Sequence, residues 1–94
     1  MVKLLSRVGD WLAEHQPDLL LYQAGADPHI DDPYGGILTT HDLLERDRTV
    51  FRAARELGVA VAWNLAGGYQ RDAQGTIQPV LDLHLNTMRA ALGG

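Results

Sequence analysis

The sequence predicts an α/β fold in which parallel strands alternate with helices. Three observations predict it: apolar residues at helical spacing in three segments, two short apolar runs between them, and a turn-rich stretch after each run. A strand, a helix and a second strand in this order imply a parallel crossover. Parallel sheets are covered on both faces, and two strands make no sheet that is stable alone. We therefore expect an incomplete slice of a three-layer α/β/α domain, in the order helix-strand-helix-strand-helix.

The first half of the chain predicts a helix, a strand and a long loop. Residues 3–15 are expected to be an amphipathic helix that Pro17 ends. Its apolar residues recur at helical spacing: Leu4, Leu5, Val8, Trp11 and Leu12. The continuous apolar run 19–22 is expected to be a strand buried on both faces. Residues 25–36 are rich in glycine, proline and aspartate, which predicts a loop.

The second half predicts a capped helix, a second strand and a third helix. Thr39 is a good N-cap residue, Asp42 can complete a capping-box-like pair with it, and Gly58 suits the C-terminal cap. Residues 59–65 read as another buried strand, in which we expect Trp63 and Leu65 to be core residues. Residues 67–69 break this strand. Helical spacing returns over residues 77–92, with a proline tolerated in the first turn.

Composition limits the possible functions. The 94 residues are expected to form a single partial domain, residues 1–94, because no repeat or linker interrupts them. A net charge of −4 without a basic run argues against a nucleic-acid partner. The absence of cysteine excludes disulfides and thiolate metal sites. No apolar stretch approaches the ~20 residues that cross a bilayer, and polar residues interrupt the N-terminal run, so we expect a soluble cytoplasmic protein.

Two loops follow the predicted strands, and they are the most unusual stretches of the chain. Ligands of open α/β sheets bind beyond the carboxyl ends of the strands. In the first loop, metal-ligating residue types stand close together: Asp27, His29, Asp31 and Asp32. From composition alone, however, loop aspartates usually make an Asx-turn or a helix-cap-like contact, and Asp27 could do the same. In the second loop, Tyr69 could aim its phenol at an oxyanion or pack its ring on the sheet edge.

These loops and their flanking residues resemble those of one enzyme family. Residues 17–27 read PDLLLYQAGAD, residues 32–36 read DPYGG, and residues 65–69 read LAGGY. In this order and spacing they are similar to the late motifs of the histone deacetylase superfamily, which has the arginase/deacetylase fold. The pair Asp47-Arg48 and the run 67–71 look closest to the class IV branch and its bacterial relatives. The resemblance covers roughly residues 10–92.

The resemblance implies a zinc-dependent hydrolase of acetyl-amide bonds, of the acetyl-lysine or acetylpolyamine type. Asp27 resembles the last zinc ligand of the family, and Tyr69 resembles the tyrosine that stabilises the oxyanion. Gly67 and Gly68 resemble the turn that aims this tyrosine. Three further residues look like loop-shaping residues: Asp32, Gly35 and Gly36. In the family, two aspartates and a histidine hold the zinc, and a tandem histidine pair handles the proton.

The sequence also departs from the family pattern. It contains no His-His pair, and the upstream Asp-x-His zinc ligands are missing. Asp27-Pro28-His29 has that spelling, but family members often carry a histidine here that is not a ligand, so His29 is a weak candidate for metal binding. The other histidines fall on expected helices, where we expect them to contact solvent or a partner: His15, His41 and His84. The chain alone is therefore expected to be inactive, with zinc absent or weakly bound.

Two functional interpretations from different classes follow. In the first, the chain is the C-terminal part of a deacetylase, completed by a missing N-terminal segment or by a second copy of the chain. Its substrate would be an acetylated small molecule or an acetyl-lysine protein. In the second, the chain is a non-catalytic remnant whose exposed sheet edge drives self-association. A self-sufficient miniature fold stays open, and a flavodoxin-like regulator is disfavoured because no phosphate-acceptor pattern is present.

Overall fold

The computed structural model describes residues 2–93 and, for residues 2–6, their backbone only. The described chain contains three helices and two strands in alternation: α1 (Val2–His15), β1 (Leu19–Gly25), α2 (Thr40–Leu57), β2 (Ala60–Ala66) and α3 (Gln78–Ala91). The predicted order of elements is confirmed. The expected apolar roles of Leu4 and Leu5 lie outside the described side chains. No helix among residues 2–93 has the length and apolar character that crossing a membrane requires.

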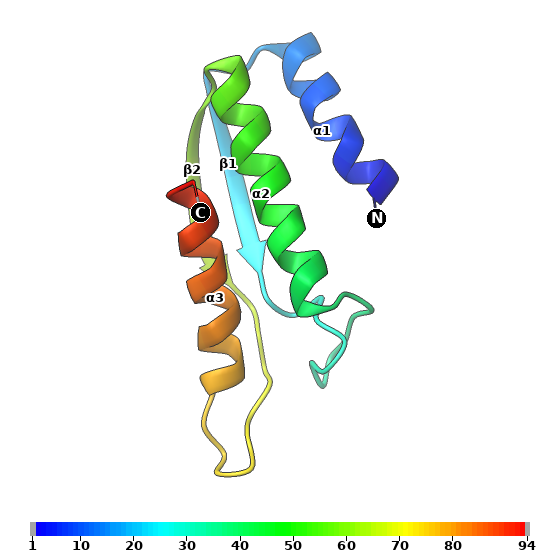
Figure 1. Ribbon diagram of the computed structural model, residues 1–94, viewed down its shortest axis with the longest axis vertical. Coiled ribbons are helices and arrows are strands. Elements are labelled where there is room, and N and C mark those ends of the chain that lie inside the picture. The colour runs from blue at the N-terminus through cyan, green and yellow to red at the C-terminus, as the bar shows by residue number, and fades with distance from the viewer. Residues whose placement is uncertain (1, 94) are drawn as a thin grey trace.

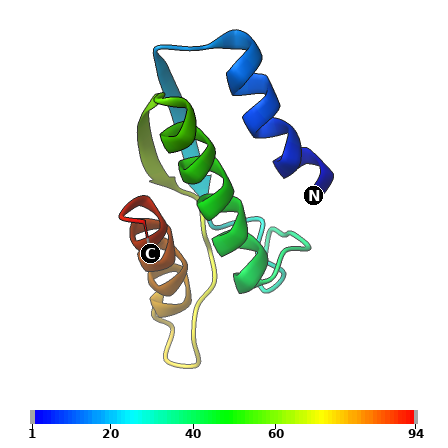
Figure 2. The ribbon, with the colours of Figure 1, turned by 45° about the horizontal axis from the view of Figure 1, so that its top comes forward.

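The two strands form a parallel sheet, as the crossover order predicts. Leu19 pairs with Ala60, and the register continues to Gly25 opposite Ala66. All three helices lie on one side of this sheet, with α2 between α1 and α3 (Figures 1 and 2). The molecule is elongated, with extents of 46 × 24 × 19 Å. The described residues thus form two layers, helices on one face of a parallel sheet, as expected for a partial α/β slice.

Helix α2 is the central element, and both of its ends are fixed by local hydrogen bonds. The Asp42 amide donates to Thr39 Oγ1 at 3.1 Å, and the Thr39 amide donates to Asp42 Oδ2 at 3.0 Å. This is the predicted capping box, which satisfies two backbone donors reciprocally. Gly58 caps the other end in a left-handed conformation, with φ of 69°. The chain then turns at once into β2.

The core lies between the helices and the covered face of the sheet. Tyr22 of β1 and Trp63 of β2 both meet Phe51 of α2 edge to face, at centroid distances of 5.6 and 5.7 Å. A second cluster lies under the loop end of α2, and it consists of Ala26, Leu43, Val80 and Leu83 with Leu38 against it. This second cluster packs the start of α3 beneath the loops that follow both strands.

The expectation that both strands are buried on both faces is wrong. Exposure alternates along each strand, and Leu19 and Leu21 remain 52% and 76% exposed. Trp63 is half-buried rather than fully enclosed, and Leu65 keeps 40% exposure, so Leu65 is not a core residue. The cause is that no element within residues 2–93 covers the second face of the sheet (Figures 1 and 2). We call this open side the bare face; its residues are Leu19, Leu21, Gln23, Ala60, Ala62 and Asn64.

Candidate active-site segment

The loops that follow β1 and β2 lie side by side at the carboxyl edge of the sheet. The Ala26 amide donates to the Ala66 carbonyl at 3.0 Å, so the pairing of the two strands continues into the loops. Parallel strands end at the same edge, and side chains that follow them meet there. The two segments that the sequence singles out therefore share one surface.

Asp27 stands at the centre of this edge, between the backbones of both loops. A Cβ atom built on Gly67 would lie 2.7 Å from Asp27 Oδ1, and one built on Gly25 would lie 2.8 Å from the same oxygen. The carboxylate thus lies against Gly25, the last residue of β1, and against Gly67, the first residue after β2. Asp27 is exposed and makes no hydrogen bond within the described part of the chain. Its oxygens are therefore available to a ligand.

Asp32 joins the two loops through a buried carboxylate. Its Oδ1 accepts the Tyr34 amide and its Oδ2 accepts the Tyr69 amide, both at 2.8 Å. The side chain is only 6% exposed. Each oxygen thus holds the backbone of a tyrosine, one in each loop. Hydrogen bonds to a charged acceptor are stronger than neutral ones, so this bridge fixes the loops relative to each other.

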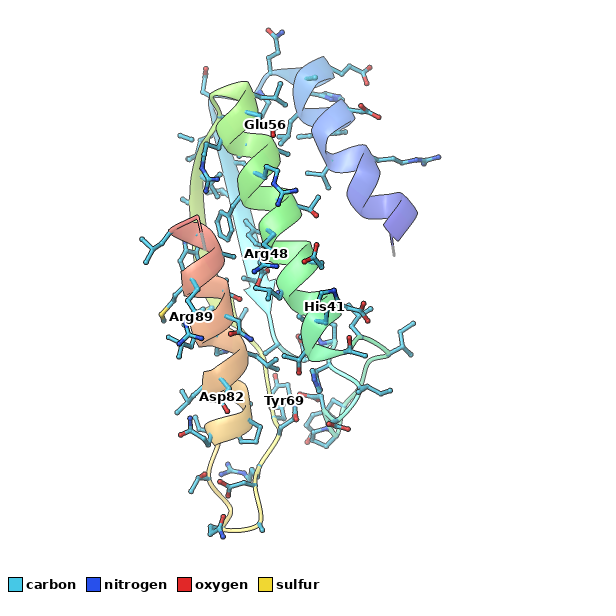
Figure 3. All side chains as sticks on the ribbon, viewed as in Figure 1. His41, Arg48, Glu56, Tyr69, Asp82 and Arg89 are labelled. Carbon is cyan, nitrogen blue, oxygen red and sulfur yellow. The ribbon has the colours of Figure 1, made fainter. Side chains whose placement is uncertain are left out.

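Tyr69 and Tyr34 are brought together by this bridge. Their rings meet edge to face with a centroid distance of 4.9 Å. Tyr69 is 50% exposed, and no hydrogen bond of its hydroxyl is present among residues 2–93. Figure 3 shows Tyr69 at the loop end of the molecule, beside the 26–36 loop. The structure therefore presents a phenol near the Asp27 edge with its ring supported from one side.

The 26–36 loop is held in shape by His29 and by a close backbone approach. The Asp31 amide donates to His29 Nδ1 at 3.1 Å, and His29 Nε2 lies 2.9 Å from Thr40 Oγ1. Since Nδ1 accepts, the ring proton sits on Nε2 and points to Thr40. Both ring nitrogens are thus engaged inside the protein, and the residue is buried. Gly36 passes so close to Pro28 that any Cβ would overlap the Pro28 carbonyl.

The remaining predicted loop residues lie in the same region. Gly35 follows a turn in which its amide donates to the Asp32 carbonyl at 3.0 Å. A Cβ on Gly68 would lie 2.6 Å from Val80 Cγ1, because the second loop crosses directly over the start of α3. Asp31 is exposed, and its carboxylate makes no hydrogen bond within the described chain.

The described residues do not form a complete metal site. Among residues 2–93, no group of three or more His, Asp or Glu side chains could hold a metal ion. Catalytic zinc sites normally use three protein ligands. The chemistry of Asp27, a free carboxylate at the strand end, suits one such ligand, and the described side chains do not supply the others.

A buried polar network, which the sequence analysis missed, lies beneath this edge. Asp47 of α2 is 1% exposed and accepts hydrogen bonds from Tyr22 of β1 and Thr87 of α3. Arg46 Nη2 lies 3.0 Å from Asp47 Oδ1. One carboxylate thus connects β1, α2 and α3. A signal was present: Asp47 falls between Leu43 and Val50 on the apolar face of α2.

This network reaches the candidate site through Arg46. Its Nη1 donates to the Gly25 carbonyl at 2.8 Å, two residues before Asp27. Burial raises the pKa of the Tyr22 phenol above its ordinary value, and the hydrogen bond to Asp47 raises that pKa further. Tyr22 therefore stays protonated as a donor to Asp47.

The expectation that His84 contacts solvent or a partner is wrong. His84 shares one face of α3 with Val80 and Thr87 and is 9% exposed, because the spacing of four and three residues turns all three toward α2. His15 and His41 are exposed, in agreement with the sequence. His15 stacks on Trp11 at a centroid distance of 4.4 Å and lies 2.9 Å from its carbonyl oxygen.

Comparison with known proteins identifies the family. Residues 1–82 match the histone deacetylase domain. An uncharacterised protein of Picosynechococcus sp. is 34% identical over 70 residues, which cover 73% of this chain and 23% of that protein. Histone deacetylase 2 of Arabidopsis thaliana is 37% identical over 59 residues, which cover 62% of this chain and 15% of that protein. The chain thus spans less than a quarter of the length of these relatives. The chain belongs to the histone deacetylase domain family.

Proposed function

We propose that this chain is the C-terminal part of a zinc-dependent deacetylase that hydrolyses acetyl-amide bonds, and that the chain alone is inactive. One observation carries the proposal. The Asp27 carboxylate lies against Gly67, and Tyr69, two residues further on, is tied to the same loop edge by Asp32. A carboxylate and a phenol thus lie at one edge of a parallel sheet, where α/β enzymes bind their ligands, and this supports their assignment as zinc ligand and proton donor.

Asp27 would supply one zinc ligand. The other ligands and the general base would come from the N-terminal deacetylase segment or from a second copy of the chain. A bound zinc ion polarises an amide carbonyl and lowers the pKa of its water. The contribution of this chain to that site is a carboxylate without competing hydrogen bonds, placed by two backbones that approach it closely.

Tyr69 would donate its phenolic hydrogen to the oxygen that becomes negative during hydrolysis. Such donors act most strongly when they are fixed before the reaction, because no reorganisation is then needed. Two contacts fix this residue: its amide on the buried Asp32 carboxylate and its ring against Tyr34. The ring is half exposed and the hydroxyl makes no hydrogen bond among residues 2–93, so both are accessible to a bound substrate.

The substrate would be an acetylated amine, either acetyl-lysine in a protein or an acetylpolyamine. The edge offers an exposed carboxylate and two aromatic rings, which suit a neutral amide attached to an alkyl chain. The excess of acidic residues gives no support for a nucleic-acid substrate.

The proposal is tested first by the genomic sequence upstream of Met1. An in-frame His-His pair and an Asp-x-His motif are expected there. Zinc content and hydrolysis of an acetyl-lysine reporter are then measured on the longer product. Asp27→Ala should remove zinc, and Tyr69→Phe should keep zinc but lower turnover by about 10²–10³. Asp31→Ala and Tyr34→Phe are the matched controls, since they change neighbouring groups of the same kind.

The outcome that would refute the proposal is equally specific. It fails if the upstream region lacks both motifs and the 94-residue chain shows neither zinc nor turnover at any concentration. Unchanged zinc in Asp27→Ala would also remove the assignment of that ligand.

A second candidate function is self-association without catalysis, and the bare face favours it. Leu19 and Leu21 are more than half exposed, and within residues 2–93 their sheet has two strands and two open edges. Apolar patches of this kind drive association. Sedimentation equilibrium should then show a dimer that Leu21→Asp dissociates. Leu92→Asp is the control, because Leu92 is 89% exposed but lies beyond α3. A monomer at all concentrations would exclude this function.

A further inference from the structure

Three arginines of α2 converge on one hollow beside the end of α3. Arg48, Arg52 and Arg55 follow at spacings of four and three residues, which places them on one helix face. They line a hollow of about 280 Å³ whose other walls are Ala90 and Gly93. We call this the arginine hollow. In the linear sequence these arginines are separated by other residues, and the helix places them on one face.

The local charge of the arginine hollow opposes that of the whole chain. The protein carries 8 basic and 12 acidic residues, yet no carboxylate is among the residues that line the hollow. Arg48 pairs with Glu45 at 3.1 Å. Arg52 and Arg55 are exposed and make no hydrogen bond or ion pair within the described part of the chain. Two guanidinium groups are therefore available at a concave surface.

The helix dipole does not account for this arrangement. A basic residue in the last turn of a helix complements the partial negative charge there. Arg55 stands in the last turn of α2 and can serve this role. Arg48 has its ion pair with Glu45. Arg52 lies further from the end than the dipole effect extends, so the dipole does not explain its place in the hollow.

We propose that the arginine hollow binds a small phosphate-bearing ligand. A guanidinium group is planar and can donate two parallel hydrogen bonds to two oxygens of one phosphate group. A terminal phosphate offers at least three oxygens, so it can accept paired hydrogen bonds from both available arginines, Arg52 and Arg55, whereas a carboxylate has only two oxygens to share between them. The volume suits one or two phosphate groups rather than a polymer. A nucleic acid is disfavoured by the net charge of −4.

This hollow is separate from the candidate active-site segment. Figure 3 shows Glu56, which directly follows Arg55, at the opposite end of α2 from His41 and Tyr69. Ala90 and Gly93 also lie beyond the residues that match the histone deacetylase domain, which end at residue 82. Phosphate binding here therefore stands or falls independently of the proposed deacetylase function.

The test is a calorimetric titration of the 94-residue chain with inorganic diphosphate at low ionic strength. Arg52→Gln with Arg55→Gln should weaken binding by about tenfold or more, since each removes charge-assisted hydrogen bonds. Arg7→Gln with Arg71→Gln removes the same charge elsewhere and should change the dissociation constant by less than about twofold. Circular dichroism verifies that both double variants stay folded, as expected for exposed side chains.

A lysine variant distinguishes bidentate hydrogen bonding by guanidinium groups from simple charge attraction. Arg52→Lys with Arg55→Lys keeps the charge but loses the paired donors, so its affinity should fall well below that of the unmodified chain. The proposal is overturned if diphosphate does not bind, if both glutamine variants lose affinity equally, or if the lysine variant binds as the unmodified chain does. Acetate that binds as tightly as diphosphate would likewise overturn it.

Discussion

The Asp27 carboxylate occupies the space where a side chain of residue 67 would begin. A Cβ on Gly67 would lie 2.7 Å from Asp27 Oδ1 and 2.8 Å from Asp27 Cγ. Gly67 also has φ of 60°, in the left-handed region. The contact joins the ends of two strands that are separated by a whole helix in the sequence. A substitution at Gly67 therefore tests whether the two loops of the candidate site pack against each other.

Gly67→Ala should therefore lower the free energy of unfolding by more than backbone strain explains. The left-handed conformation costs a non-glycine residue about 1–3 kcal/mol. Gly75→Ala is the control, because Gly75 has φ of 78° but nothing lies within 4 Å of its Cβ position. Adding Asp27→Ala should remove the excess cost of Gly67→Ala in a double-mutant cycle measured by urea unfolding. Equal costs at residues 67 and 75 would contradict the contact.

Asp32→Asn should loosen the second loop. An amide side chain has a single acceptor oxygen, so it cannot hold the Tyr34 and Tyr69 amides together. The lost bond leaves a buried donor unpaired, which costs about 1–3 kcal/mol. Hydrogen exchange should become faster at the Tyr34 or Tyr69 amide. Asp31→Asn is the adjacent control and should leave both rates unchanged, because that carboxylate is exposed.

Asp47→Ala should be the most destabilising of these substitutions. It leaves the Tyr22 and Thr87 hydroxyls and the Arg46 guanidinium without their common acceptor. Removing one partner of a buried ion pair costs about 3–5 kcal/mol. Asp82→Ala removes an exposed carboxylate of α3 and should cost under about 0.5 kcal/mol. Thermal unfolding that shifts equally in both variants would show that the network does not stabilise the fold.

Stability should fall in alkaline solution because of Tyr22. Its pKa is raised in the folded chain, so the folded state holds this proton more tightly than the unfolded state does. The contribution is complete below the unfolded pKa of about 10 and is lost as the pH rises from there toward the folded pKa. Tyr22→Phe should flatten this decline in urea unfolding at pH 9 to 11, about one unit on either side of that value. The same slope in both proteins would contradict the assignment.

The sequence was sufficient for the elements whose signals are local. The capping box of Thr39 and Asp42, the cap at Gly58 and the break at Pro17 all depend on neighbouring residues, and the structure contains them. The meeting of the loops after β1 and β2 followed from topology, because parallel strands end at one edge. Family membership followed from motifs in these same loops.

Features that depend on distant residues were not predictable in the same way. Asp47 has partners 25 and 40 positions away, in Tyr22 and Thr87, and its only local sign is a polar residue on an apolar helix face. The arginine hollow depends on where the end of α3 comes to lie. Burial of Leu65 was predicted wrongly because a continuous apolar run does not reveal whether both faces of a sheet are covered.

The double acceptor at Asp32 has a consequence for altering the chemistry of this edge. Because one carboxylate orients the main chain of both tyrosine-bearing segments, a change made in either segment is transmitted to the other. Substitutions in residues 33–35 would therefore also shift the Tyr69 phenol in the other loop. A library of variants should therefore vary both loops together and keep Asp32 unchanged.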